Sequence, residues 1–351
     1  MPHLTLQDLP PRWAHFCLDI AAFVHREVGK DLRGQFLFLG LSRGVDSTAL
    51  LLWAHLLQPR LKTRVHALHV YHGLRPEADE EADSLHRLCC SLDIPLHKGH
   101  TAVGTYAARQ QIGLEEAGRR LRYRFLLGSL RRRGGDLLLV GHHLNDLAED
   151  MLMRQLRGVG WPALGGMLAW EASRSLLRPF LLTPKQRLQD FVQACGYTWL
   201  EDASNQDQSF TRNRIRHQIL PRLLAENPGY LHQVASLWRQ ARIDADFWDM
   251  DLQELVACEH MTSQGILLPA RTLLSLHPAQ RLRWYRSVLK RLGPGQVLAE
   301  TLFQVDRAWR NQTWRKRFQF PGDKEIMVSC KGLICFVQGS LKGSSPQKRS
   351  S

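Results

Sequence analysis

The sequence lacks the features that mark secreted, membrane-spanning and disulfide-bonded proteins. No apolar run approaches the roughly 20 residues of a membrane-spanning helix, and the N-terminus has no basic segment followed by an apolar core, as a secretory signal would. The seven cysteines are an odd number, and no two are separated by just two residues. This pattern argues against a disulfide framework, a zinc ribbon and a typical iron–sulfur site. We therefore expect a cytoplasmic protein with no membrane partner.

Acidic residues are scarce relative to basic ones. The 351 residues include 47 Lys and Arg against 33 Asp and Glu, a formal net charge of +14. A surplus of this size suits a polyanionic partner such as nucleic acid, although a basic but inert surface has the same composition. Seven arginines fall in one stretch that we expect to be helical: Arg119, Arg120, Arg122, Arg124, Arg131, Arg132 and Arg133.

Short apolar runs alternate with helical stretches in the first half of the chain. We expect strands at residues 36–41, 65–70, near 96 and at 136–141, with helices at 48–57, 77–92, 115–132 and 145–157. This alternation predicts an α/β fold with a doubly wound parallel sheet and helices on both faces. Ligands of such sheets bind beyond the carboxyl ends of the strands.

The character of the sequence changes after Pro221. Residues 222–260 have a helical pattern, and residues 265–337 mix helical stretches with strand-like runs. We predict a nucleotide-binding catalytic domain at 1–217, a smaller, mostly helical domain at 218–338, and a disordered Gly/Ser/Lys-rich tail at 339–351.

A candidate phosphate loop follows the first expected strand. Backbone N–H groups at a helix N-terminus bind phosphate oxygens, and a carboxylate there suits Mg²⁺. We expect Asp46 to be the metal ligand, because an anion is badly placed for direct phosphate contact. The Gly-Lys-Ser/Thr pattern of ordinary P-loop NTPases is absent, while a plain Ser-rich helix cap is the simpler alternative. The nucleotide-binding candidates in the loop are Ser42, Arg43, Gly44, Val45, Asp46 and Ser47.

This loop resembles the PP-loop of the N-type ATP pyrophosphatases, S-G-G-x-D-S. These enzymes split ATP between the α- and β-phosphates and adenylate a substrate. Arg43 stands where the pattern has its first Gly. If that position requires a positive φ, Arg there costs on the order of 1 kcal/mol; alternatively, its side chain points at phosphate.

Further segments resemble the tRNA(Ile)-lysidine synthases. Residues 70–75 match H-V-x-H-G-L-R and place His72 at the end of the second strand, near the nucleotide. Residues 116–123 resemble the family's E-A-x-A-R-x-x-R-Y helix. The resemblance implies that Arg119 neutralises phosphate charge as pyrophosphate leaves, although a solvated basic helix has the same pattern.

The segment after the fourth strand, Gly141-His-His-Leu-Asn-Asp-Leu-Ala-Glu149, resembles the family's H-H-x-D-D-Q-A-E-T signature. His143, Asp146 and Glu149 match the signature and share a helix face. A carboxylate pair near a nucleotide can hold Mg²⁺ or orient and deprotonate an amine. Three positions depart from the pattern: Asn145, Leu147 and Asp150.

Residues 199–221 resemble the family's W-x-E-D-x-S-N-x-D…R-N-x-I-R…L-P. The resemblance implies that Glu201, Asp202 and Asn205 hold the lysine or shape the loop. The basic residues suit tRNA backbone and base contacts. An Asx-rich turn followed by a basic helix is the bland alternative. The candidate tRNA contacts here are Arg212, Asn213 and Arg216.

The resemblance implies an ATP-dependent ligase with Mg²⁺ as cofactor. In this family, ATP adenylates O2 of cytidine 34 in the CAU anticodon of isoleucine tRNA, and the L-lysine ε-amine attacks C2. Asp46, Arg119, Asp146 and Glu149 are the implied catalytic residues. The resemblance also implies tRNA binding by residues 218–338 and a homodimer.

Two other functions fit the same residues. One is a PP-loop ATPase that acts on another tRNA base or on a small molecule. The other is a protein that binds tRNA but has lost its chemistry, which the departures at Arg43, Asn145 and Leu147 would support.

Overall fold

The structure is a computed structural model that describes residues 4–71, 77–200, 210–295 and 297–337. The chain forms two compact units, Met1–Ala241 and Arg242–Ser351, which divide inside helix α10 (Tyr230–Ala257). This division falls later than the boundary expected after residue 217. Residues 218–241 belong with the first unit because Leu220 and Trp238 pack in one apolar cluster with Leu144 and Leu147. The expected disordered tail lies outside the described residues.

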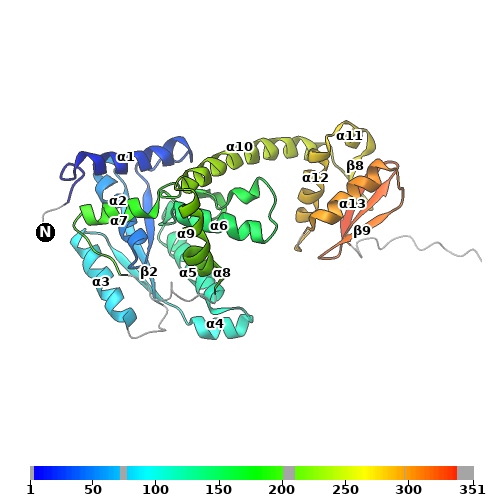
Figure 1. The fold of residues 1–351 in the computed structure, drawn as a ribbon. Coiled ribbons are helices and arrows are strands. Elements are labelled where there is room, and N and C mark those ends of the chain that lie inside the picture. The colour runs from blue at the N-terminus through cyan, green and yellow to red at the C-terminus, as the bar shows by residue number, and fades with distance from the viewer. Residues whose placement is uncertain (1–3, 72–76, 201–209, 296, 338–351) are drawn as a thin grey trace, which may run out of the picture. The chain divides into compact units, whose positions relative to one another are not determined.

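The first unit is built on a six-stranded sheet of order β3-β2-β1-β4-β6-β5 (Figure 1). All its neighbouring strands run parallel except the β5–β6 pair, which confirms the expected sheet. The strands are β1 (Phe36–Leu41), β2 (Arg64–Tyr71), β3 (Leu96–His100), β4 (Leu137–Val140), β5 (Trp170–Glu171) and β6 (Leu176–Leu177).

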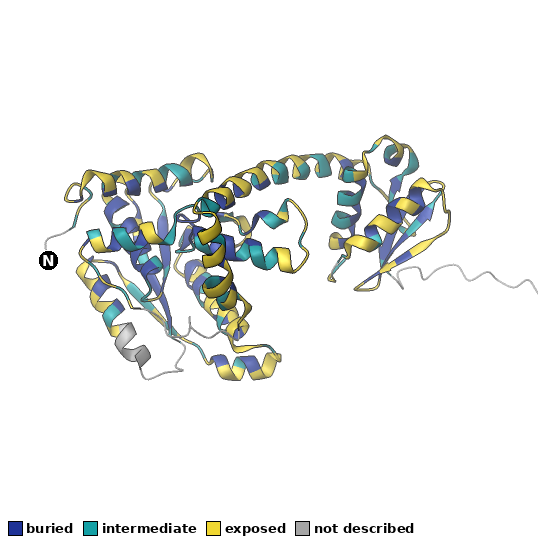
Figure 2. Ribbon diagram, in the orientation of Figure 1, coloured by how far each residue is buried: buried dark blue, intermediate teal, exposed yellow. Residues whose placement is uncertain are grey.

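Helices cover both faces of this sheet. The odd-numbered residues of β1, Leu37 and Leu39, pack in a core with helices α1, α2, α3 and α7. The even-numbered Phe36 and Phe38 pack with α5 on the opposite face, as the two-residue period of a strand requires. The central strands β1 and β4 are correspondingly buried (Figure 2). The helices of this unit are α1 (Pro11–Arg26), α2 (Val45–Leu61), α3 (Glu77–Ser91), α4 (Val103–Gln110), α5 (Leu114–Arg132), α6 (Leu144–Leu156), α7 (Lys185–Ala194), α8 (Thr211–Arg214) and α9 (Leu220–Glu226), with a π-helical turn at Ile215–Ile219 between α8 and α9.

The second unit mixes helices with an antiparallel sheet of order β7-β8-β11-β10-β9. Trp284 and Trp309 lie in its core, 0% and 6% exposed. They therefore stabilise this unit and do not offer open ring faces for RNA bases. Its elements after α10 are β7 (His260–Thr262), β8 (Gly265–Pro269), α11 (Ala270–Ser275), α12 (Pro278–Arg291), α13 (Ala299–Arg310), β9 (Arg317–Phe320), β10 (Lys324–Ser329) and β11 (Gly332–Val337).

Among the described helices, none is both long enough and apolar enough to cross a membrane. The carboxyl ends of β1 and β4 lie side by side because the two strands pair in parallel. The β1 end leads into α2 through Ser42–Gly44, and the β4 end leads into α6 through Gly141–His143. Two helix N-termini therefore meet at one edge of the sheet, where ligands of such folds bind.

Candidate active site

The phosphate loop is closed by its own serine hydroxyls. Ser47 Oγ lies 2.5 Å from the Ser42 carbonyl oxygen and 3.0 Å from that of Gly44, so its hydrogen is donated within the loop. Ser42 Oγ accepts the Gly44 N–H at 3.4 Å. Gly44 is the extended N-cap of α2, and Val45 begins the helix. The loop thus places the positive end of the α2 dipole at the edge of the sheet.

Arg43 points away from the position of a phosphate on α2. Its Nε donates to Ser84 Oγ of α3 at 2.9 Å, and its Nη1 donates to the Thr198 carbonyl at 3.2 Å. Partial burial, with the nearby Arg87 charge, lowers the pKa of its guanidinium. Arg43 does not have a positive φ, so the loop does not require glycine at this position. Arg43, which replaces the family's glycine, therefore links the loop to Ser84 and Thr198 without backbone strain.

Asp46 carries a buried oxygen without a hydrogen-bond donor. Asp46 Oδ1 has no hydrogen-bond partner within the described structure, and His143 Nε2 lies 3.4 Å away without the geometry of a hydrogen bond. A buried, unsatisfied carboxylate oxygen beside a phosphate loop fits a hard cation such as Mg²⁺. The described residues contain no cluster of three or more His, Cys, Asp or Glu side chains that could hold a metal.

His143 caps helix α6 and faces both helix N-termini. Its Nδ1 accepts the Asp146 N–H at 3.3 Å, and its own N–H donates to Asp146 Oδ2 at 3.1 Å, a reciprocal capping box. Since Nδ1 accepts, the ring hydrogen is on Nε2, which lies 3.4 Å from Asp46 Oδ1 and 3.5 Å from Asp146 Oδ2. Burial disfavours the charged ring, but Asp146 and Asp46 outweigh burial and raise the pKa of His143.

The two loops approach so closely that only glycine fits between them. A Cβ atom on Gly141 would lie 2.7 Å from the Asp46 carbonyl oxygen and 2.9 Å from its carbonyl carbon. These are backbone atoms at the start of α2, and they cannot rotate away as the end of a side chain can. Gly141 therefore fixes the spacing between the phosphate loop and the His143 cap.

Two buried carboxylates and two arginines form one hydrogen-bonded cluster. Glu149, 1% exposed, accepts Arg212 Nε at 2.8 Å, Arg216 Nε at 2.6 Å and Arg216 Nη2 at 2.9 Å. Asp146 Oδ1 accepts Arg212 Nη2 at 3.0 Å and Arg216 Nη2 at 3.2 Å. Burial opposes ionisation of Asp146, but His143 and the two arginines outweigh it and lower its pKa. Two negative and two positive groups thus neutralise one another.

This cluster brings together residues that the sequence assigned to different ligands. Asp146 and Glu149 were expected to face lysine, and Arg212 and Arg216 to face tRNA, yet they are mutual partners here. The separation of more than 60 residues between the pairs hides this contact from motif reading. Asn213 lies half-buried in α8 between the two arginines.

Arg119 is exposed on α5 and belongs to a second basic group. Three guanidinium carbons surround the Tyr123 ring, those of Arg119 at 5.9 Å, Arg122 at 5.6 Å and Arg174 at 5.6 Å from its centroid. Arg122 also lies close enough to Arg212 for their charges to repel. Sequence reasoning missed Arg174, because it comes from a separate segment with no motif of its own.

The three departures in the α6 signature have structural explanations. Asn145 Oδ1 accepts the Lys185 N–H at 3.0 Å and so supports the start of α7. Leu147 is fully buried in an apolar cluster, and Asp150 pairs with Arg154 one turn later. The three residues at these positions support local packing and helix ends. Asp146 and Glu149 instead pair with Arg212 and Arg216.

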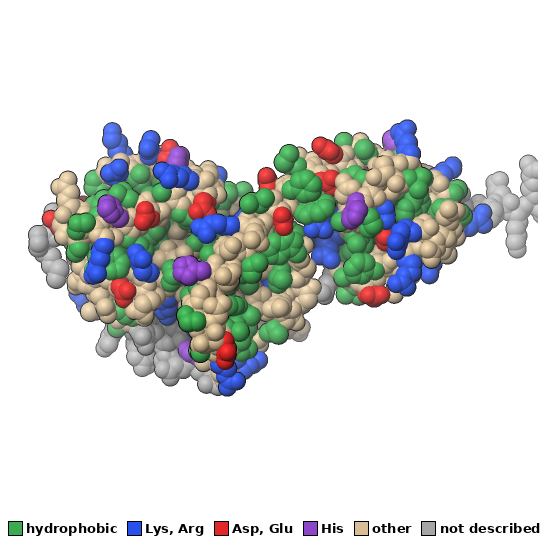
Figure 3. Space-filling model, turned by 45° about the horizontal axis from the view of Figure 1, so that its top comes forward, with side chains coloured by type: hydrophobic (Ala, Val, Ile, Leu, Met, Phe, Trp, Pro, Cys, Tyr) green, Lys and Arg blue, Asp and Glu red, His purple; other side chains and the backbone are tan. Residues whose placement is uncertain are grey.

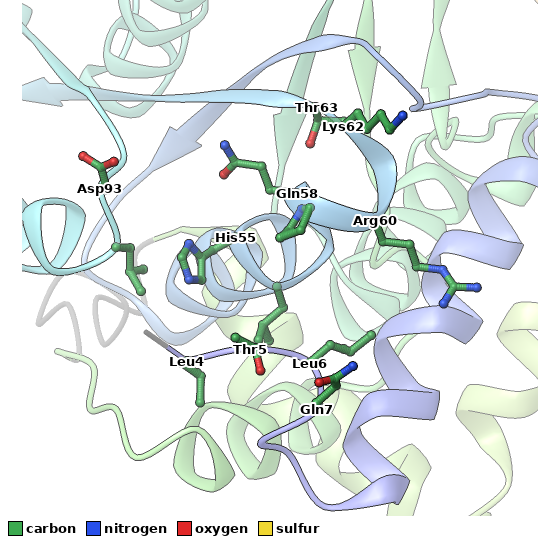
Figure 4. Close-up of a pocket in the computed structure, with 13 residues that line it drawn as sticks. Leu4, Thr5, Leu6, Gln7, His55, Gln58, Arg60, Lys62, Thr63 and Asp93 are labelled. Carbon is green, nitrogen blue, oxygen red and sulfur yellow. The ribbon is translucent and has the colours of Figure 1, made fainter. Parts of the chain in front are cut away.

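Four predicted site residues, His72, Glu201, Asp202 and Asn205, lie outside the described residues. A cavity of about 910 Å³ lies away from the phosphate loop and the arginine–carboxylate cluster. Its lining includes His55, Gln58, Lys62 and Asp93 (Figure 4). It surrounds the C-terminal end of α2, about 24 Å from the phosphate loop at 1.5 Å per helical residue. None of its lining residues belongs to the predicted site.

Basic side chains are dispersed over the face shown in Figure 3. On the face shown in Figure 3, Lys and Arg side chains are interspersed with acidic and apolar ones in each unit. The concentrated positive charge near the site comes instead from the arginines around Tyr123 and around Glu149.

Comparison with known proteins agrees with this geometry. A PP-loop domain model matches residues 19–223, which makes the first unit a PP-loop ATP-using domain. The solved structure of a U34-tRNA thiolase from Methanococcus maripaludis shares the fold, with a TM-score of 0.53 and 16% identity over 64% of this chain and 78% of that one.

Two relatives narrow the class to one family. A tRNA(Ile)-lysidine synthase of Nitratidesulfovibrio vulgaris is 44% identical over 337 residues, 91% of this chain and 97% of that protein. The corresponding enzyme of Enterococcus faecalis is 32% identical over 70% of this chain, which spans about half of that protein (53%). The chain belongs to the tRNA(Ile)-lysidine synthase family, a family of ATP-dependent ligases.

Proposed function

We propose that this chain joins L-lysine to C2 of cytidine 34 in the CAU anticodon of isoleucine tRNA, with release of AMP and pyrophosphate. The observation that carries the proposal is the position of His143, whose Nε2 lies within 3.5 Å of carboxylates on both helix N-termini. The candidate nucleotide-binding loop and the carboxylates suited to binding an amine, Asp146 and Glu149, therefore lie in one site. Activation by ATP and attack by an amine both need that proximity.

The nucleotide side of the site consists of the phosphate loop, Asp46 and Arg119. Backbone N–H groups at the start of α2 bind the triphosphate, and Arg119 on α5 offsets charge on the departing pyrophosphate. Mg²⁺ held by Asp46 Oδ1 and phosphate oxygens would supply charge neutralisation for the same groups. The cytosine O2 attacks the α-phosphorus, and pyrophosphate leaves.

The amine side consists of Asp146 and Glu149. The lysine ε-ammonium must lose a proton before its nitrogen can attack C2 and expel AMP. Asp146, with its lowered pKa, is suited to holding the ammonium as an ion pair and is a weak base. The target base has to leave the anticodon stack to reach this site, as is usual for single-stranded RNA.

Arg212 and Arg216 pair with these carboxylates in the structure. A lysine ammonium has to replace at least one guanidinium, because a third cation would leave the cluster with excess buried charge. The tRNA backbone offers the displaced arginines phosphate oxygens of equal charge. In this proposal tRNA therefore prepares the lysine site.

The second unit supplies additional tRNA contacts in this proposal. Arg286, Arg307 and Arg310 lie on its helices α12 and α13, and basic helices of this kind bind RNA backbone. A homodimer and a cytoplasmic location stay predictions from the family resemblance.

The direct test is incorporation of labelled lysine into a CAU-anticodon isoleucine tRNA transcript with ATP and Mg²⁺. We expect one lysine per tRNA and matching release of AMP and pyrophosphate. The control is the methionine tRNA with the same anticodon, which should remain unmodified. A folded protein that binds the isoleucine tRNA but transfers no lysine would contradict the proposal and favour the binding-only function.

A further inference from the structure

Arg178 follows β6 and is buried beneath the site, although no motif of the sequence pointed to it. Arg178 is 3% exposed, and its guanidinium makes hydrogen bonds to three different partners. Nη1 donates to the Leu168 carbonyl at 2.6 Å, Nη2 donates to Glu171 Oε1 at 2.6 Å, and Nε donates to His142 Nδ1 at 3.1 Å. The first two bonds fix the guanidinium, so the third acts from a rigid donor.

The third bond determines which nitrogen of His142 carries hydrogen. An arginine donates hydrogen bonds and cannot accept them. His142 Nδ1 must therefore present a lone pair, and the ring hydrogen of neutral His142 is on Nε2. Protonation would place a second hydrogen between Nδ1 and the guanidinium. Burial first, and then the arginine charges, lower the pKa of His142 to about 3, so the ring stays neutral at physiological pH.

His142 lies among the charged groups of the site. It follows Gly141 at the carboxyl end of β4, and the charges of Asp146, Arg212 and Arg122 all act on it. His142 as a residue is half-buried. The neighbouring His143 has the same tautomer, but there a backbone N–H imposes it. Two adjacent histidines are thus held as Nε2–H donors by two independent contacts.

We propose that Arg178 is a positioning residue that holds His142 as a neutral Nε2–H donor for an acceptor oxygen of the reacting substrates. This inference rests on the proposed ligase function for its role, whereas the tautomer itself does not depend on it. A fixed N–H donor stabilises negative charge that develops on oxygen during phosphoryl transfer, and it needs no reorganisation. The opposite tautomer would place a lone pair against that charge.

The first experiment reads the tautomer directly. Protein labelled with ¹⁵N-histidine is studied by NMR at neutral pH, and the His142 signals are assigned by their loss in His142→Gln. We expect hydrogen on Nε2 and a lone pair on Nδ1 in the wild type, with a mixture of tautomers in Arg178→Met. A protonated ring or an Nδ1–H tautomer in the wild type would overturn the proposal, whether or not the protein transfers lysine.

The second experiment separates the donor from simple packing. A glutamine amide nitrogen can lie near the position of Nε2, whereas an asparagine side chain reaches only the position of Nδ1. We expect His142→Gln to retain more kcat than His142→Asn, and Arg178→Met to lose kcat by about ten- to a hundredfold, the usual effect of removing a side chain that orients another. The KM values for ATP and lysine should change little.

Arg239→Met is the matched control. It removes a guanidinium that pairs with Glu27 and leaves Arg178 and His142 in place, so kcat and the His142 signals should stay near wild type. Equal kcat in His142→Asn and His142→Gln, or a wild-type kcat in Arg178→Met, would contradict the proposal. Absence of lysine transfer by the wild type would instead refute the proposed function, and the NMR result would still decide the tautomer.

Discussion

The two acidic centres of the site differ in how their oxygens are satisfied. Asp46 has a buried oxygen with no hydrogen-bond partner, whereas Glu149 accepts three charge-assisted hydrogen bonds. The first centre can accept a cation with nothing to displace. The second must exchange one cation for another. Similar carboxylates in one site can therefore differ in when they become available to bind a cation.

Asp46→Asn should have the largest effect on activity. The amide removes the negative charge that suits Mg²⁺ while preserving size, and we expect lysine incorporation to fall by at least about 100-fold, the scale of losing one preorganised electrostatic group. The measurement is incorporation as a function of Mg²⁺ concentration. Asp150→Asn, which weakens a half-buried pair with Arg154 and leaves Asp46 unchanged, is the control. Unchanged activity in Asp46→Asn would show that the Asp46 carboxylate does not hold a cation needed for the reaction.

Glu149→Gln should have the largest effect on stability. It leaves Arg212 and Arg216 partly buried with weaker acceptors, and we expect a loss of about 3 kcal/mol in the free energy of unfolding, at the low end for breaking a buried pair. Urea denaturation measures it. Glu116→Gln breaks an exposed pair with Arg120 and should change stability by less than 1 kcal/mol. Equal losses in both variants would show that the buried cluster adds nothing.

Arg216→Met tests the exchange itself. It frees Glu149 Oε1 from its shortest hydrogen bond, so lysine should bind about tenfold more tightly in the absence of tRNA, the size of one charge-assisted hydrogen bond of ~1.5 kcal/mol. Binding of tRNA should weaken. Equilibrium dialysis with labelled lysine measures the first effect, with Arg214→Met, at the end of α8, as the control. If the wild type without tRNA binds lysine as tightly as Arg216→Met does, lysine does not have to displace an arginine.

The pH dependence of stability should reveal the ionised state of Asp146. Its pKa is lowered in the folded protein, so its stabilisation is complete above the unfolded pKa of about 3.9 and is lost as pH falls through the folded pKa. Wild type should therefore lose more stability than Asp146→Asn between neutral pH and the acid range. Parallel curves from urea denaturation at several pH values would contradict the assignment.

Arg43→Gly should have the smallest effect. The variant restores the family glycine and removes hydrogen bonds to Ser84 and Thr198, so we expect a loss of about 1 kcal/mol in stability and activity within about twofold of wild type. Thermal denaturation and lysine incorporation measure the two effects. A large gain in activity would show that Arg43 obstructs the nucleotide.

The sequence predicted the parallel sheet and the two loops because both depend on local patterns. Strand β1 and the start of α2 follow from an apolar run and a loop motif within a dozen residues. The pairing of Glu149 with Arg212 and Arg216 could not be predicted, since it depends on how α8 packs against α6. Arg178 was missed for the same reason: its proposed role depends on His142, 36 residues away, in the loop that follows strand β4.

The close contact between Gly141 and the Asp46 backbone restricts how the specificity of this enzyme can evolve. A single hard contact joins the first turn of one helix to the cap of another, so neither loop can be shifted alone. Variation that adapts the pocket to a different nucleotide would also displace the cap, and variation that adapts it to a different amine would also displace the loop. The two specificities are mechanically linked, and we expect them to evolve together or to remain fixed.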